Sequence, residues 1–212
     1  MARLSSIFAT PLIVERLDDA DLDEALERAI LERRDTQRGI RRSNIGGWHS
    51  DTAILDWGGP PARALGRKVI ALANRHTADR KGGRIEHDWL IEGWANVSER
   101  GAANTVHTHP AAFWSAVYYV RVGGGEGGKL ILLDPRLPAL TMQAPDLLFH
   151  GTGAQRQVAL QPAAGMLVMF PAWLNHMVSP WEGGGPRISV AFNLSGRHRP
   201  RPGLMPASRI PE

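Results

Sequence analysis

Three histidines are the residues of this sequence best suited to chemistry. His107 and His109 are separated by one residue, and His176 lies far along the chain. If the first two lie on a strand, their imidazoles point to the same face, because alternate residues of a strand share a face. A chain that folds back on itself would bring the third imidazole to them. Each piece alone is more often a surface or structural histidine, but together they predict a metal site of His107, His109 and His176.

An arginine and a serine follow the third histidine. Arg187 and Ser189 come just after the turn Gly183–Pro186. If segments 176–178 and 187–194 are neighbouring strands, the arginine and the third histidine face one interior. An arginine forms a bidentate fork on a carboxylate, and the serine hydroxyl adds a donor on the same side. We expect this pair to bind a carboxylate near the metal; a surface salt bridge is the competing interpretation of the arginine alone.

The lack of cysteine limits the metal chemistry. None of the 212 residues is Cys, which excludes disulfides, thiolate metal sites and iron–sulfur clusters. A metal ion would have to be bound by imidazole, carboxylate or water. The composition, with 43% hydrophobic and 22% charged residues, is that of a folded globular chain.

The first part of the chain, residues 1–84, is expected to be mostly helical and to support the rest. Apolar residues recur at helical spacing from Leu22 to Ile30, after aspartates in the segment 18–21. A break is expected at 58–61, and a second helix is predicted from about residue 62 to residue 77.

The second part, residues 85–196, is expected to consist of strands. Its short apolar runs are separated by glycine and proline, and about eight strands at this spacing suit a β-sandwich or jelly roll. We therefore predict a single α+β domain, mainly β with N-terminal helices on one sheet, and an extended tail at 197–212. The predicted strands are Asp88–Val97, Asn104–His107, Trp114–Val122, Lys129–Leu133, Gln157–Leu160, Met166–Phe170, His176–Val178 and Arg187–Leu194.

Charge and hydropathy argue against two kinds of partner. The net charge is +4, and the basic residues are almost all arginine, which in a near-balanced chain is usually a solvated surface. A nucleic-acid partner would predict a basic stripe, and the best candidate is only the short tail 197–201. No apolar run approaches the ~20 residues that span a bilayer, and the N-terminus lacks a signal-like apolar core. We expect no membrane or nucleic-acid partner, and a cytoplasmic protein.

The candidate site resembles that of the iron(II)/2-oxoglutarate oxygenase superfamily. The order His107-Thr-His109-Pro, then His176, then Arg187-x-Ser189 is similar to its pattern of His-x-Asp/Glu, a distal His and a later Arg. The run Val-Tyr-Tyr-Val ending at residue 120 resembles a strand of the prolyl-hydroxylase branch whose second tyrosine helps bind the cosubstrate, which implies Tyr119. The resemblance implies a double-stranded β-helix (jelly roll, cupin-like), Fe(II), 2-oxoglutarate and dioxygen.

The resemblance extends over most of the chain to a group of bacterial 2-oxoglutarate–iron oxygenases. The core motif is moderately specific, whereas the N-terminal matches carry no known chemistry. The further matching stretches are Phe8–Leu12, Asn44–Ser50, Trp94–Asn96, Ser115–Tyr119, Asp134–Arg136 and Phe170–His176.

One position departs from the superfamily pattern. His109 stands where the superfamily has a carboxylate, so three neutral imidazoles would leave the metal site one unit more positive. Such a ligand set also suits zinc. Alternatively Asp134 or Glu126 supplies the carboxylate, although Asp134, which ends an apolar run before Pro135, is better interpreted as a turn residue. Iron and zinc both stay open.

Other residues carry competing interpretations. The glycine-rich run 123–128 joins two predicted strands, so we interpret it as a flexible hairpin connection rather than a phosphate-binding loop. Trp114 and Trp173 are close to the histidines in sequence, but core packing is the commoner role of tryptophan. Asn96 faces the site or makes a structural hydrogen bond. The remaining histidines show no ligand-like spacing, although His150 could touch a substrate; the others are His49, His76, His87 and His198.

The expected activity is hydroxylation of a substrate that the sequence does not identify. A free amino acid, a small metabolite and a protein side chain all stay open, as does the oligomeric state, a homodimer included. One rival is a cupin-like three-histidine metalloenzyme that does not use 2-oxoglutarate, against which Arg187 and Ser189 argue. The other is a non-catalytic carboxylate-binding module, against which the intact histidine set argues.

Overall fold

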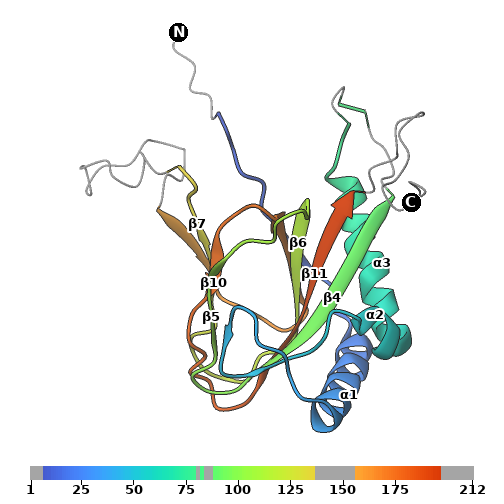
Figure 1. Cartoon of the computed structure of the whole chain (residues 1–212), viewed down its shortest axis with the longest axis vertical. Coiled ribbons are helices and arrows are strands. Elements are labelled where there is room, and N and C mark those ends of the chain that lie inside the picture. Colours follow the sequence, from blue (N-terminus) through green and yellow to red (C-terminus); the bar gives the residue numbers. More distant parts are fainter. Residues whose placement is uncertain (1–6, 80–81, 84–87, 137–155, 197–212) are drawn as a thin grey trace, which may run out of the picture.

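Two antiparallel sheets face each other in the computed structural model, which describes residues 7–79, 82–83, 88–136 and 156–196 (Figure 1). The larger sheet contains, in spatial order, β1 (Ile13–Arg16), β9 (Met166–Pro171), β6 (Trp114–Arg121), β11 (Arg187–Gly196), β4 (Trp89–Ser98) and β3 (Trp48–His49). The smaller sheet contains, in order, β2 (Asn44–Ile45), β5 (Ala103–His107), β10 (His176–Val178), β7 (Leu130–Leu133) and β8 (Gln157–Leu160).

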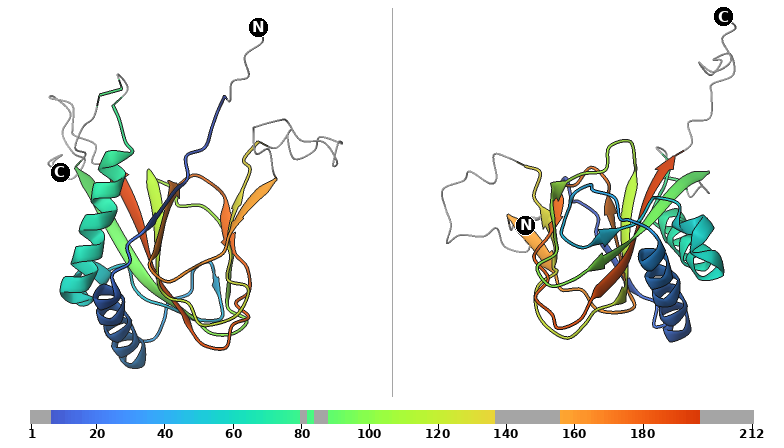
Figure 2. Two further views of the ribbon diagram at one scale, coloured as in Figure 1. Left: turned by 180° about the vertical axis from the view of Figure 1, so that it is seen from behind. Right: turned by 60° about the horizontal axis from the view of Figure 1, so that its bottom comes forward.

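The helices lie on the outer face of the larger sheet, which leaves its inner face toward the smaller sheet (Figure 2). They are α1 (Ala20–Thr36), α2 (Ile54–Trp57) and α3 (Gly59–Arg75). Asp19 caps α1, since its side chain accepts a hydrogen bond from the backbone N–H of Leu22 at 3.2 Å. None of these helices, in the ranges that the structure describes, is long and apolar enough to cross a membrane.

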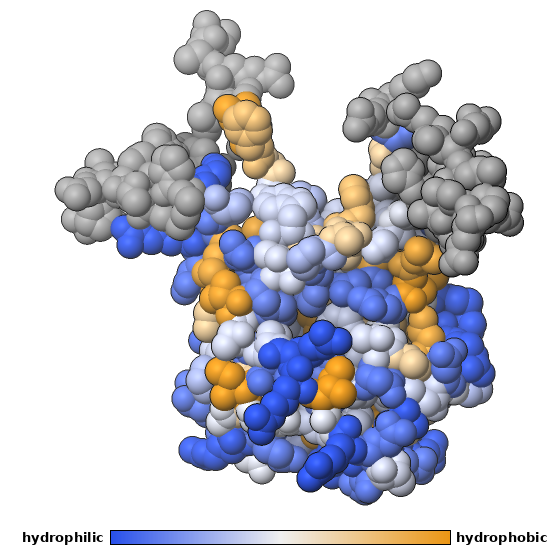
Figure 3. All heavy atoms as spheres, viewed as in Figure 1, coloured by the Kyte–Doolittle hydropathy of each residue, from blue (hydrophilic) through white to orange (hydrophobic). Residues whose placement is uncertain are grey.

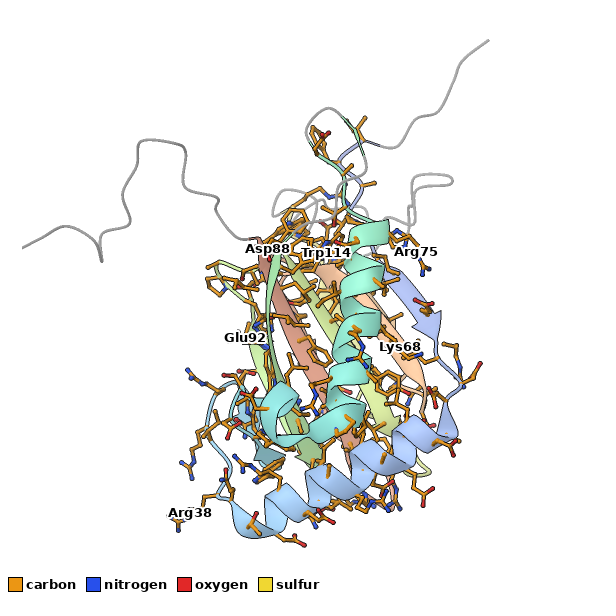
Figure 4. All side chains as sticks on the ribbon, turned by 90° about the vertical axis from the view of Figure 1, so that its right-hand side faces the viewer. Arg38, Lys68, Arg75, Asp88, Glu92 and Trp114 are labelled. Atoms are coloured by element: carbon orange, nitrogen blue, oxygen red, sulfur yellow. The ribbon has the colours of Figure 1, made fainter. Side chains whose placement is uncertain are left out.

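Two hydrophobic clusters hold these layers together. The outer cluster packs α1 and α3 on the larger sheet (Figure 4). It includes Leu26 and Leu65 of the helices and Tyr118 and Phe192 of the sheet. The inner cluster, which includes Val168 of β9 and other side chains of both sheets, lies between the sheets. Full burial of one such side chain contributes roughly 1.5–3 kcal/mol to the free energy of unfolding.

The predicted fold class is confirmed, because the chain is mainly β with few helices and its β-core is a double-stranded β-helix. All the strands expected between residues 85 and 196 are present. The region before residue 84 is less helical than expected, because it also supplies β1, β2 and β3. The second helix starts earlier than predicted, since the prolines of the break occupy its first turn, where a missing N–H costs nothing. The tail 197–212 lies outside the described residues.

The glycine-rich run 123–128 is not the hairpin connection that the sequence suggested. It joins β6 of the larger sheet to β7 of the smaller one. Its backbone pairs with the segment before β11: the N–H of Gly128 donates to Pro180 at 2.9 Å, and that of Gly184 donates to Gly124 at 2.9 Å. The two glycine-rich segments therefore close one end of the space between the sheets together.

Candidate metal and carboxylate site

Three histidines meet on the inner face of the smaller sheet. His107 ends β5 and His176 begins β10, and the two are directly opposite each other in the antiparallel pair. His109 lies beyond the end of β5, so the strand alternation used to place it does not apply there. Its backbone N–H instead donates to the carbonyl of Ala172 at 3.0 Å, which ties it to the segment that leads into β10.

The geometry of the three rings suits one metal ion. The ring centroids of His107 and His176 are 4.2 Å apart, and His109 is 5.1 Å from each. One ligand nitrogen from each ring lies within 4.8 Å of the other two. Among the described residues these three form the one group of side chains that could hold a metal.

Backbone carbonyls orient two of the imidazoles. Nδ1 of His176 donates to the carbonyl of Leu174 at 2.9 Å, and Nδ1 of His107 donates to that of Thr105 at 2.7 Å. A carbonyl accepts only from an N–H, so Nε2 of each ring carries the lone pair that a metal requires. Ser43 places its hydroxyl 3.4 Å from Nε2 of His107.

The electrostatics keep all three rings neutral. Burial, with a smaller contribution from the neighbouring His107, lowers the pKa of His176 to about 3 and that of His109 to about 4. Burial also lowers the pKa of His107. Near pH 7 all three imidazoles are therefore in the form that binds a metal.

A buried guanidinium lies deeper between the sheets. Arg187, at the start of β11, is 2% exposed, and its Nη2 donates to Ser98 Oγ at 3.1 Å. Its Nε has no hydrogen-bond partner, and no described carboxylate pairs with it. Burial lowers its pKa, and the Tyr119 ring lies 5.8 Å from its Cζ. A buried charge without a counter-ion is costly, so the site fits an anionic ligand.

Arg187 does not reach this place by the route that the sequence suggested. β10 and β11 are in different sheets, so they are not neighbours; the turn Gly183–Pro186 carries the chain across. Ser189 and Tyr119 line the same pocket and pair across β11 and β6, which puts both on the inner face. The expected convergence of histidines and arginine holds, but it runs across two facing sheets.

The alternative carboxylates lie elsewhere. Asp134 accepts hydrogen bonds from the backbone N–H and the guanidinium of Arg136, and the lowered pKa of its carboxyl has this arginine as its main cause. It is the turn residue that we preferred. Glu126 is exposed in the glycine-rich run, and neither carboxylate joins the histidine group.

One cavity of about 530 Å³ contains the histidines, Arg187, Ser189 and Tyr119. Asn96 also lines it, whereas Trp114 is a core residue that donates to Thr77 and Trp173 is 54% exposed. His150 lies outside the described residues.

Sequence reasoning missed several residues of the site, and strand register identifies most of them. Ser98 holds Arg187 from β4, where the two are directly opposite each other. The Trp94 ring is 5.6 Å from that of His109 and also stacks on His49. The other missed lining residues that matter below are Arg42, Glu92, Ser115 and Asn193.

Several solved enzyme structures have a similar fold. A prolyl-4-hydroxylase from Pseudomonas putida covers 89% of this chain and 94% of its own, with a TM-score of 0.59 and 20% identity. A Trichoplax adhaerens prolyl hydroxylase, solved with a hypoxia inducible factor peptide, has a TM-score of 0.63 at 12% identity (87% and 83% covered). HygX from Streptomyces hygroscopicus, solved with nickel and 2-oxoglutarate, has 0.60 at 13% (89% and 84% covered).

The fold is a double-stranded β-helix, and it carries a group of three histidines that could hold a metal ion. Residues 92–193 match the family model described as "Putative 2OG-Fe(II) oxygenase", so this part of the chain is similar to the 2-oxoglutarate–iron(II) oxygenases. Among curated protein sequences, none matches this chain. The family match implies Fe(II) and 2-oxoglutarate as cofactors, with dioxygen as the oxidant.

Proposed function

We propose that the protein is a hydroxylase in which His107, His109 and His176 hold Fe(II) while Arg187 binds the far carboxylate of 2-oxoglutarate. The observation that carries this proposal is the buried guanidinium, which has no counter-ion among the described residues and lies in the same cavity as three neutral imidazoles. Bound iron and 2-oxoglutarate would supply the activation of dioxygen. One oxygen atom ends in the new hydroxyl group and the other in succinate, while carbon dioxide leaves and the substrate C–H bond is oxidised.

The residues of the chain act by binding, orientation and exclusion of water. Leu174 and Thr105 fix the tautomers of two imidazoles, so that Nε2 faces the metal position. Ser98 orients Arg187 from β4, and Ser189 and Tyr119 present hydroxyl groups beside it. Burial raises the pKa of Tyr119, so its hydroxyl keeps its proton and can donate to a carboxylate. The inner cluster excludes bulk water from this end of the cavity.

The identity of the metal has to be measured directly, because three imidazoles also suit zinc. We expect anaerobically purified protein to take up Fe(II) and to convert 2-oxoglutarate to succinate slowly without substrate. Replacement of His107 or His176 by alanine should abolish iron binding, measured by elemental analysis. Unchanged iron content in both variants, or zinc-loaded protein with full activity, would contradict the assignment.

Replacing Arg187 tests the carboxylate site. Arg187→Met should weaken 2-oxoglutarate binding by about 2–5 kcal/mol, the scale for truncating one partner of a buried charge pair. Calorimetry on the metal-loaded protein under anaerobic conditions measures this. The metal-free variant should be at least as stable as the parent, because it no longer buries an unpaired charge. Arg136→Met, at an exposed ion pair, is the control and should change neither quantity. Parental affinity in Arg187→Met would place the carboxylate elsewhere.

A further inference from the structure

A row of polar side chains crosses the inner face of the larger sheet at the end away from Arg187. Ser115, Asn193 and Glu92 are in register across β6, β11 and β4. Ser115 Oγ donates to Asn193 Oδ1 at 3.0 Å, and Asn193 Nδ2 donates to Glu92 Oε1 at 3.0 Å. The serine and asparagine are 3% and 7% exposed, whereas the glutamate is exposed at the cavity wall. A buried polar pair therefore holds the carboxylate by one oxygen.

The position of Glu92 suits a substrate rather than the cosubstrate. It lies two residues from Trp94, whose ring contacts His109, and alternate strand residues are roughly 6.6 Å apart on one face. On β11, the strand next to β4, the inner face leads from Asn193, opposite Glu92, through Ser189 to Arg187. In Figure 4 Glu92 lies beside β4, clear of α3. The candidate metal position thus separates the guanidinium end of the cavity from the Glu92 end.

Glu92 has an unused acceptor. It is the sole carboxylate among the described residues that line the cavity. Its second oxygen, Oε2, has no hydrogen-bond partner within the part of the chain that the structure describes. A carboxylate held in this way at a cavity wall favours a cationic N–H donor, because charge-assisted hydrogen bonds are the stronger ones.

A positively charged side chain, that of Arg42, lines another wall of the cavity. β2 joins the edge of the smaller sheet and β3 that of the larger sheet, so the segment that contains both bridges the sheets (Figure 1). Arg42, an exposed residue just before β2, lines the cavity, and no side-chain hydrogen bond or ion pair is found for its guanidinium among the described residues. It lies close enough to His49 to help lower the pKa of that imidazole, although burial is the main cause. Figure 3 shows strongly hydrophilic side chains over this segment.

We propose that the substrate is a small free amino acid, with its ammonium group bound by Glu92 and its carboxylate by Arg42. This inference rests on the proposed oxygenase function and adds the substrate class. A residue inside a polypeptide has neither free group, so the two charges together select a free zwitterion over a peptide. The C–H bond that is oxidised lies between the two anchors and the three histidines, and the electron and atom balance is that of the hydroxylation given above.

A panel of paired compounds tests the substrate class. Succinate formation by the iron-loaded protein is measured with each common amino acid, its N-acetyl form, its methyl ester and the corresponding decarboxylated amine. We expect at least one free amino acid to stimulate succinate formation, with little effect from its three capped or truncated forms. Equal stimulation by the N-acetyl ester or by a peptide would overturn the inference. So would no stimulation by any free amino acid in protein that forms succinate without substrate. Protein that neither binds 2-oxoglutarate nor forms succinate would instead refute the oxygenase assignment.

Two substitutions test the two anchors separately. Glu92→Gln should raise the amino-acid concentration that gives half-maximal succinate formation roughly tenfold, since it removes one partly exposed charge-assisted contact. It should also reduce the ratio of stimulation by the free amino acid to stimulation by its N-acetyl form. Arg42→Gln should instead reduce the ratio of stimulation by the free amino acid to stimulation by its methyl ester. Glu99→Gln and Arg41→Gln are matched controls, at exposed residues that do not line the cavity, and should keep the parental selectivity.

A binding measurement checks the same inference without turnover. The effective amino acid should raise the melting temperature of zinc-loaded parent protein with 2-oxoglutarate under anaerobic conditions. The shift should shrink in Glu92→Gln and Arg42→Gln but not in the control variants. Equal shifts in all five proteins would place the amino acid elsewhere.

Discussion

At the scale of single residues, the unusual feature is His109. The superfamily pattern that the site resembles has a carboxylate at this position, whereas here the imidazole ring contacts His107, His176 and Trp94. Burial keeps it neutral, so the site carries one more unit of positive charge than a carboxylate would allow. A more positive site should favour the dianionic cosubstrate.

The first prediction concerns this histidine. His109→Ala should lose most of its iron, whereas His109→Asp should retain iron because a carboxylate is also an iron ligand. His109→Asp should also bind 2-oxoglutarate more weakly than the parent, since the added negative charge opposes a dianion. Elemental analysis after anaerobic reconstitution and calorimetric titration measure the two effects. His76→Ala, at an exposed helix end, is the control. Full iron content in His109→Ala would mean that this imidazole is not a ligand.

The residues that the sequence could reveal are those whose type alone suggests chemistry. The sequence reveals His107, His109, His176 and Arg187 because imidazoles are common metal ligands and a guanidinium binds carboxylates. Glu92 and its neighbours do not stand out, since an alternating strand of mixed polar and apolar residues gives no sign of which face meets a cavity. Their role depends on the register of β4, β11 and β6, which no local pattern specifies.

At the scale of elements, the sequence predicts strands better than their partners. The long strands were predictable because each alternates or is uniformly apolar between glycine and proline breaks. Membership of a sheet was not: the turn Gly183–Pro186 and the run 123–128 each cross from one sheet to the other, whereas short glycine-rich connections usually suggest hairpins. The two-residue strands β2 and β3 are too short to leave a pattern.

Among the connecting segments, the glycine-rich run 123–128 leaves space for the side chain of Arg187. Gly128 has a φ of +59°, and a Cβ there would lie 3.1 Å from Cδ of Arg187 and 3.0 Å from Cε3 of Trp181. Only glycine combines this backbone conformation with so close an approach. The loop therefore packs against Arg187 and helps to shape this end of the cavity.

The second prediction follows from that contact. Gly128→Ala should lower the free energy of unfolding by about 1–2 kcal/mol, because alanine is strained at positive φ, and should weaken 2-oxoglutarate binding by displacing the guanidinium. Urea unfolding and calorimetry measure the two quantities. Gly124→Ala in the same run is the matched control, since a Cβ there meets nothing within 4 Å. Equal effects of the two substitutions would show that the run acts only through its flexibility.

At the scale of the whole molecule, the larger sheet separates the helical layer from the cavity, and one tyrosine faces each side. The chain has 2 tyrosines, and they are consecutive on β6. Tyr118 faces the helices and donates to Asp23 of α1 at 2.5 Å, whereas Tyr119 faces the cavity beside Arg187. Burial is the main cause that raises the pKa of each phenol, with the Asp23 hydrogen bond adding to it at Tyr118.

The third prediction uses this pair as a reporter of global folding. Because each phenol has a higher pKa folded than unfolded, both stabilise the fold fully below pH 10, the ordinary value for tyrosine, and this stability is lost as the pH rises above it. We expect no phenolate absorbance from native protein near pH 10, and then both phenolates in one step with the loss of circular dichroism. The same protein in concentrated urea should titrate near pH 10, and Tyr118→Phe should halve the amplitude. Phenolate absorbance that grows near pH 10 while the circular dichroism is unchanged would mean that one tyrosine reaches solvent, and with it that one face of the larger sheet is open.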